Sequence, residues 1–173
     1  MQKYVISFPK SGRTWLRYSL NIAGHADSIR FTHDGFEYND GTKPSLSFDR
    51  QKRIEFYTKT ADRIVYLERD ARDTIVSLYH QITGRFRDFF NYQDDISAFI
   101  RDPYFGVHNL IAFQAMWRKL VCQLPVLVVH YEEMSQDYKK VLAMISSHFQ
   151  LGLSQKQIQS ISEQTTFDKM KDV

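Results

Sequence analysis

Short, continuously apolar runs alternate along the chain with longer segments in which apolar residues recur every three or four positions. The run 126–129, Val-Leu-Val-Val, is apolar at every position, which is typical of a strand buried on both faces of a sheet. Strands that alternate with helices predict an α/β domain with a parallel sheet and helices on both of its faces. We expect strands at 3–8, 29–32, 63–69 and 126–130, and helices at 14–23, 48–58, 71–83, 95–100, 107–120, 138–149 and 154–161.

The first predicted strand ends in a loop that is suited to binding an anion. Pro9-Lys10-Ser11-Gly12 separates this strand from a helix that begins near residue 13 or 14. The free amides at the start of a helix, and the positive end of its dipole, attract negative charge. Lys10 adds a cation, and Ser11 and Thr14 add hydroxyl donors. The common nucleotide-binding loop places its lysine after the second glycine, whereas Lys10 precedes Gly12. We therefore predict a phosphate-binding loop of a different kind.

A second candidate anion site follows the strand expected at 63–69. Arg69 ends this strand, and Asp70 is a suitable N-cap residue for the next helix. Ser77 lies eight residues after Arg69, inside that helix. Ligands of parallel sheets bind beyond the carboxyl ends of the strands. Arg69 and Ser77 could therefore reach one anion at the same edge as the first loop.

Length and composition limit the class of protein. The 173 residues, 43% of them hydrophobic, suffice for one well-packed core, so we expect a single domain over 1–173. A net charge of +3 is too small to argue for nucleic acid as a partner. We expect no membrane span and no signal peptide, because no apolar run has the length or pattern of either. The lone Cys122 precludes an intramolecular disulfide, which favours a cytoplasmic location.

The two loops together resemble those of a known family. Residues 9–15, Pro-Lys-Ser-Gly-Arg-Thr-Trp, resemble the 5′-phosphosulfate loop of cytosolic-type sulfotransferases, usually Pro-Lys-Ser-Gly-Thr-Thr-Trp. Residues 69–77, Arg-Asp-Ala-Arg-Asp-Thr-Ile-Val-Ser, resemble that family's Arg-Asn-x-x-Asp-x-x-x-Ser. The resemblance implies a three-layer P-loop-type fold and 3′-phosphoadenosine-5′-phosphosulfate (PAPS) as sulfuryl donor. It further implies that the donor is bound by Lys10, Ser11, Gly12, Arg13, Thr14, Trp15, Arg69 and Ser77, the last two at its 3′-phosphate.

The resemblance also implies an adenine site and a general base. Trp15 would stack on the adenine. Residues 165–170, Thr-Thr-Phe-Asp-Lys-Met, resemble the family's Thr-Ser-Phe-x-x-Met, in which the threonine contacts the base and the phenylalanine stacks opposite the tryptophan. Thr165 and Phe167 take these places here, although Phe167 could instead pack in the core. His33, in Phe-Thr-His-Asp-Gly after the strand at 29–32, resembles the family's general base, and His80 is the alternative.

The reaction implied by the resemblance is in-line transfer of a sulfuryl group to a hydroxyl or an amine. His33 would take the proton of the acceptor, Lys10 would stabilise the leaving oxygen, and no metal is needed. The family pattern continues with a basic Arg-Lys-Gly run over the 3′-phosphate, and the sequence reaches Val173 without it. Truncation, a donor held by fewer contacts, and an inactive nucleotide-binding module all stay open. A P-loop kinase is disfavoured, because it needs a lysine after the glycines and an acid for magnesium.

The acceptor is not specified by these motifs. Residues 84–106 hold many aromatic and basic side chains beside the predicted site, which favours a substrate lid. Aromatic rings could stack on a phenol or a sugar, and arginines could favour an acidic glycan. A small-molecule or a glycan acceptor is therefore expected, and the oligomeric state is left open.

Overall fold

The computed structural model describes residues 1–37, 41–43 and 45–170. These residues form a sheet of four parallel strands in the order β2-β1-β3-β4. In this sheet, the central Val5 pairs with Phe31 on one side and with Val65 on the other. The strands are β1 (Gln2–Ser7), β2 (Ile29–Thr32), β3 (Ala61–Glu68) and β4 (Val126–His130).

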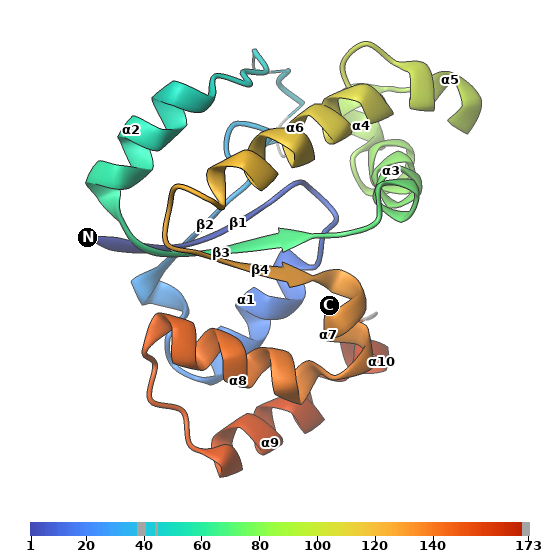
Figure 1. The fold of residues 1–173 in the computed structure, drawn as a ribbon. Helices are drawn as coiled ribbons and strands as arrows, with labels where there is room; N and C mark the ends of the chain where they lie inside the picture. The colour runs from blue at the N-terminus through green and yellow to red at the C-terminus, as the bar shows by residue number, and fades with distance from the viewer. Residues whose placement is uncertain (38–40, 44, 171–173) are drawn as a thin grey trace.

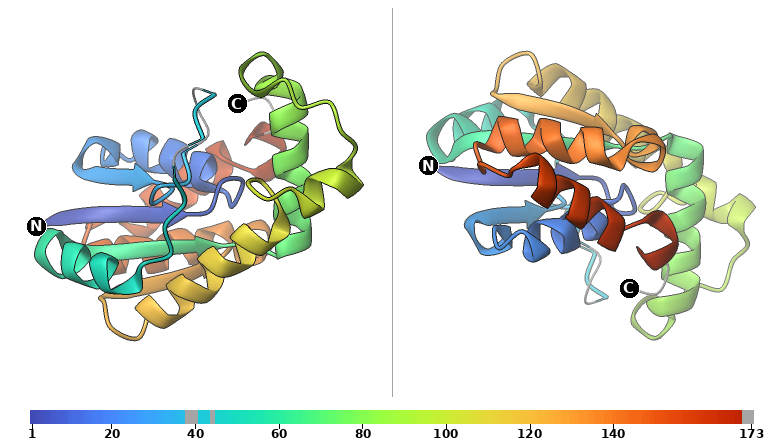
Figure 2. Two further views of the ribbon diagram at one scale, coloured as in Figure 1. Left: turned by 90° about the horizontal axis from the view of Figure 1, so that it is seen from above. Right: turned by 90° about the horizontal axis from the view of Figure 1, so that it is seen from below.

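Helices cover both faces of the sheet, which confirms the predicted three-layer α/β fold (Figures 1 and 2). Side chains of neighbouring strand positions alternate between the two faces, so Tyr4 and Ile6 join one core cluster while Val5 joins the other. The first cluster lies under α2 (Arg50–Thr60), α3 (Ala71–His80) and α6 (Val107–Leu120). The second lies under α1 (Arg13–Ile22), α8 (Tyr138–Phe149) and α9 (Gln155–Gln164).

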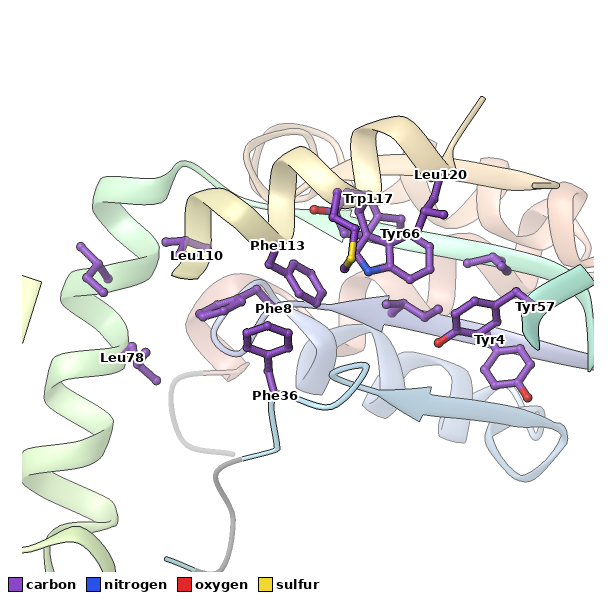
Figure 3. Close-up of a cluster of buried hydrophobic side chains, with 14 of the residues drawn as sticks. Tyr4, Phe8, Phe36, Tyr57, Tyr66, Leu78, Leu110, Phe113, Trp117 and Leu120 are labelled. Atoms are coloured by element: carbon purple, nitrogen blue, oxygen red, sulfur yellow. The ribbon is translucent and has the colours of Figure 1, made fainter. Parts of the chain in front are cut away.

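The first core cluster is rich in aromatic rings that support the loops of the site (Figure 3). Phe8, Phe36 and Phe113 contact one another with centroids 4.9–5.5 Å apart. Phe8 immediately precedes the loop that begins at Pro9, and Phe36 lies three residues after His33. Burial of these two rings against α6 therefore anchors both loops to one rigid support.

Most predicted elements are found within one to three residues of their expected bounds. The helix expected at 71–83 ends at His80 and continues as a π-helical turn, η2 (Gln81–Arg85). A short helix expected near 95–100 is α5 (Ile96–Arg101). Four short helices were not expected from the pattern: η1 (Ala26–Ser28), α4 (Arg87–Phe90), α7 (Tyr131–Gln136) and α10 (Phe167–Met170).

The segment predicted as a substrate lid, 84–106, divides into buried and exposed parts. Phe99 and Phe105 are fully buried and stack with centroids 5.5 Å apart, so they belong to the core. Phe89 is 54% exposed. The lid stays a prediction, but the aromatic character of the segment is explained in part by packing.

The topology brings the predicted site residues to one edge of the sheet. All four strands run in the same direction, so their carboxyl ends lie together, at the end where α3 and α7 begin (Figure 1). The chain leaves β1 to form β2 on one side and later returns as β3 on the other. Such a reversal of strand order opens a crevice for ligands outside the carboxyl ends of the strands.

Candidate functional site

A cleft of about 630 Å³ occupies this edge of the sheet. Its walls come from segments that are far apart in the sequence, including the loop after β1, the start of α1, α3 with η2, and the start of α7. The described residues that line it are Pro9, Lys10, Gly12, Arg13, Thr14, Trp15, Arg17, His33, Arg69, Ser77, Gln81, Arg85, Phe86, Tyr131, Phe167 and Met170. Of the ten residues predicted to bind the donor, eight line this cleft together with His33, the predicted general base.

The loop after β1 has the backbone conformation of an anion-binding turn. Lys10 and Gly12 both have positive φ angles, of 72° and 91°. A non-glycine residue with positive φ is uncommon and costs free energy, and such strain is concentrated at functional sites. Gly12 is the N-cap of α1 and, within the described residues, no side chain caps it. The first amides of α1 are therefore available to a negatively charged ligand in the cleft.

Gly12 is required by the close approach of a ring from the opposite wall. A Cβ atom at Gly12 would lie 2.7 Å from Cδ2 of Tyr131. The guanidinium of Arg69 also packs on this ring, 4.3 Å from the Tyr131 ring centroid. It donates to the Lys10 carbonyl at 3.0 Å. The loop, Tyr131 and Arg69 thus form one packed unit that joins the ends of β1, β3 and β4.

Two guanidinium nitrogens in the cleft region are buried without a hydrogen-bond partner among the described residues. They are Nη1 of Arg13 and Nε of Arg69. The carboxylate of Glu37 lies 3.8 Å from Arg13 Nη1, which is an ion pair but too long for a hydrogen bond. Buried donors of this kind are rare unless a ligand satisfies them. Both orphaned groups therefore fit an anionic ligand.

The positive charges of the cleft perturb one another. Burial lowers the pKa of Lys10, and the charges of Arg69 and Arg85 lower it further. Burial also lowers the pKa of Arg13, which Glu37 opposes. Among the described residues that line the cleft there is no Asp or Glu. The cleft is thus a concentrated cationic site, and negative charge placed in it would relieve this repulsion.

His33 is held in the tautomer that a general base needs. Its Nδ1 lies 2.8 Å from the carbonyl oxygen of Ser7. A carbonyl only accepts hydrogen bonds, so Nδ1 carries the proton and the lone pair remains on Nε2. The ring is 8% exposed and lines the cleft. Burial, together with the charge of Arg13, lowers the pKa of His33 to about 4, although Glu37 acts in the opposite direction.

Two carboxylates that the sequence did not single out hold the segment after β2. Asp34, at a φ of 54°, accepts from Tyr57 Oη at 2.9 Å and from Trp117 Nε1 at 3.1 Å. Its other close partner is Arg53, whose Nε lies 2.5 Å from Oδ2. Glu37 accepts from the backbone amide of His33 at 2.5 Å. The adjacency of acids to His33 was visible in the sequence, but the partners of Asp34 lie 19 to 83 residues away and could not be inferred from it.

The predicted adenine site is only partly formed. Trp15 is 5% exposed and stacks on Tyr138, with centroids 4.6 Å apart. Phe167 is 47% exposed, and its centroid lies 6.1 Å from that of Trp15 at an angle of 51°. A base between two rings needs about 3.5–4 Å on each side, hence a separation of about 7–8 Å. Phe167 would have to turn and move outward to complete such a clamp.

Two residues predicted to bind the PAPS donor, Thr165 and Ser11, do not line the cleft. Thr165 is fully buried; its hydroxyl donates to the Ile161 carbonyl at 2.8 Å, and its own carbonyl accepts from Trp15 Nε1 at 2.7 Å. Ser11 is 2% exposed and is not one of the lining residues. The structure thus gives Thr165 a supporting place behind Trp15, and direct contact of either residue with a ligand stays a prediction. His80, the alternative base, is exposed and also lies outside the lining.

The described part of the chain holds neither a side-chain group suited to a metal ion nor a helix suited to crossing a membrane. Within it, three or more His, Cys, Asp or Glu side chains are nowhere grouped so that they could hold a metal ion. None of its helices combines the length and apolar character that crossing a membrane requires.

The chain belongs to the sulfotransferase family. The family's sulfotransferase domain model matches residues 54–173, which are more than half of the chain. The match begins after the loop at 9–15 and after His33. This membership confirms the resemblance that the two phosphate-site motifs indicated.

Individual relatives match from 66% to 97% of this chain. Human Sulfotransferase 2B1 is 24% identical over 97% of this chain and 51% of the human protein. Zebrafish (Danio rerio) Sulfotransferase 6B1 is 31% identical over 66% of this chain and 39% of its own length. The chain thus spans about half the length, or less, of these two curated relatives.

Solved structures share the fold. The crystal structure of mouse sulfotransferase SULT7A1 complexed with PAP has a TM-score of 0.72 and 20% identity, over 99% of this chain and 66% of that one. Retinol dehydratase, in complex with androsterone and inactive cofactor PAP, has a TM-score of 0.58 and 19% identity with the same coverage.

Proposed function

We propose that this chain is a PAPS-dependent sulfotransferase domain that moves a sulfuryl group to a hydroxyl or amine acceptor. The observation that carries the proposal is the convergence of the strained loop after β1, His33 and Arg69 on one cleft with unpartnered guanidinium nitrogens. Family membership supports it. The PAP complexes of SULT7A1 and retinol dehydratase support a nucleotide of this kind as the ligand.

The residues present in the cleft fit the donor. The amides at the start of α1, Lys10 and Thr14 would hold its 5′-phosphate. Arg69, whose Nε is orphaned and buried, would hold the 3′-phosphate together with Ser77. Arg13 takes the place of a threonine in the family loop. Its guanidinium would supply a further charged hydrogen-bond donor to the 5′-phosphate. Ser11, Gly12, Trp15, Thr165 and Phe167 complete the proposed donor site, with Thr165 acting from behind Trp15.

The chemistry would divide between two groups of this chain. When bound, the donor supplies an electrophilic sulfur, to which the acceptor oxygen bonds as the bond from sulfur to the 5′-phosphate oxygen breaks. Nε2 of His33, free because Nδ1 donates to Ser7, would receive the acceptor proton. The ammonium of Lys10 would stabilise the electron pair left on the phosphate oxygen, a contribution of about 3 kcal/mol for a preorganised donor.

Several further expectations accompany this function. We propose that no metal takes part, that the protein acts in the cytoplasm, and that the acceptor is a small molecule or a glycan. Residues 84–106 are proposed to close over the acceptor, because Arg85 and Phe86 line the cleft.

The first experiment is binding followed by transfer. Calorimetry should show that the protein binds 3′-phosphoadenosine-5′-phosphate more tightly than ATP, because Arg69 and Ser77 would read the 3′-phosphate. Radiolabelled sulfate from PAPS should then appear on at least one member of a panel of phenols, sugars and amines. Binding without transfer would support the inactive module, and a preference for ATP would point to a kinase.

Two substitutions test the proposed roles. His33→Ala should abolish transfer and leave affinity for 3′-phosphoadenosine-5′-phosphate nearly unchanged, because the base contacts the acceptor. Lys10→Ala should lower turnover by about a hundredfold or more. The matched controls are His80→Ala and Lys139→Ala, both at exposed positions outside the cleft lining. Transfer that survives His33→Ala would assign the base elsewhere.

A further inference from the structure

The cleft holds more Lys and Arg side chains than the proposed binding of PAPS uses. Five of its lining residues are Lys or Arg, and none of its described lining residues is acidic. Lys10, Arg13 and Arg69 have proposed partners on the donor. Arg85 has none, and it comes from η2, outside the loop and the strand ends that form the donor site. Arg17 also lines a second cavity beside α1.

Arg85 belongs to a row of polar side chains that leads away from the donor's 3′-phosphate. Ser77, Gln81 and Arg85 are spaced four residues apart along α3 and η2, and all three line the cleft. The backbone at Arg85 therefore lies on the order of 10 Å beyond that at Ser77. A phosphate held by Ser77 and Arg69 would be poorly placed for Arg85.

Arg85 and Lys10 line the same cleft, and their charges interact. Arg85 is one of the two charges that depress the pKa of Lys10, the residue proposed at the leaving oxygen. Phe86, the next residue, lines the same wall and offers a ring. This wall of the cleft thus combines the amide of Gln81, the guanidinium of Arg85 and the ring of Phe86. A π-helical turn is rare and is often found at functional sites, and η2 is the turn that carries Gln81 and Arg85.

We propose that Arg85 recognises an anionic group on the acceptor, so that this domain sulfates a hydroxyl compound that already carries a carboxylate, sulfate or phosphate. The proposal rests on the proposed function and names the acceptor class for the same site. Arg85 would pair with the anion, Gln81 would donate to it, and Phe86 would contact the adjoining ring. The anion would also offset the repulsion between Arg85 and Lys10.

The test compares two probes that differ in charge on protein already saturated with 3′-phosphoadenosine-5′-phosphate. 4-Hydroxybenzoate should bind about tenfold more tightly than 4-hydroxybenzamide, since a charge-assisted pair replaces a neutral contact. Arg85→Gln should remove this preference. Arg50→Gln, which changes an exposed arginine at the start of α2 and outside the cleft lining, should retain it.

Each other result overturns the proposal. Equal affinity for the two probes, or a preference that Arg85→Gln leaves intact, would remove Arg85 from the acceptor site. If Arg85→Gln chiefly weakens binding of 3′-phosphoadenosine-5′-phosphate, Arg85 reads the donor. Failure of the wild-type protein to bind this nucleotide at all would instead refute the proposed function, and the acceptor assignment with it.

Discussion

Gly12→Ala should be among the most damaging single substitutions in the loop that follows β1. Two separate costs arise there. An alanine at a φ of 91° is strained by about 1–2 kcal/mol. Its Cβ would also lie 2.7 Å from Cδ2 of Tyr131, and relieving such an overlap in a packed region costs about 1–3 kcal/mol. We therefore expect a total loss of about 2–5 kcal/mol in the free energy of unfolding.

A second glycine separates the two costs. Gly24 has a φ of 74°, and a Cβ there would meet nothing within 4 Å. Gly24→Ala should therefore show only the backbone cost, about 1–2 kcal/mol. Urea denaturation at constant m-value measures both variants. Equal losses for Gly12→Ala and Gly24→Ala would refute the steric part of the reasoning.

A double-mutant cycle identifies the atom responsible. Tyr131→Ala removes the ring that the new methyl group would strike, so the double variant should be more stable than the sum of the single losses predicts, by about 1–3 kcal/mol. Gly12→Ala should also weaken binding of 3′-phosphoadenosine-5′-phosphate, because displacement of Tyr131 disturbs the Arg69 guanidinium stacked on it. Additive losses in the cycle would show that the strain is taken up elsewhere.

Three further predictions follow from the buried charges. The pKa of His33 is about 4 in the folded protein and about 6.5 when unfolded, so the unfolded chain binds more protons between these values and stability should fall as pH drops through this window. The free energy of unfolding, measured by urea titration, should fall by about 2–3 kcal/mol at pH 4.5 in the wild type. His33→Asn should lack this loss, and identical pH profiles for the two proteins would contradict the prediction. Arg69→Ala should weaken the binding of 3′-phosphoadenosine-5′-phosphate about tenfold to a hundredfold but hardly change the binding of adenosine 5′-phosphosulfate, which lacks the 3′-phosphate. Equal losses of affinity for the two nucleotides in calorimetry would give Arg69 a purely structural role. Asp34→Ala should cost about 3–5 kcal/mol by leaving Arg53 buried without its partner, and thermal denaturation unchanged from wild type would disprove that coupling.

Local sequence determined the fold class and the two phosphate-site motifs. Hydrophobic periodicity is a property of neighbouring residues, so the strands at 29–32 and 126–130 and the helix at 107–120 were predicted with their observed bounds. The positions of Lys10 and Arg69 at strand ends followed from the same pattern. Because parallel strands end at one edge, the meeting of these two residues in one cleft could be expected from the sequence alone.

Tertiary structure alone decided how these residues are supported and charged. Contacts of Asp34 with Trp117 and of Arg69 with Tyr131 join residues separated by 83 and 62 positions, and no local pattern encodes them. The placement of Thr165 behind Trp15, and not in the cleft wall, depends on the packing of α9 against α1. The perturbed pKa of His33 likewise arises from burial and from Arg13, which is distant in sequence. Hydrophobic periodicity predicts which face of a helix or strand is buried. Which element packs against that face depends on how the whole chain folds.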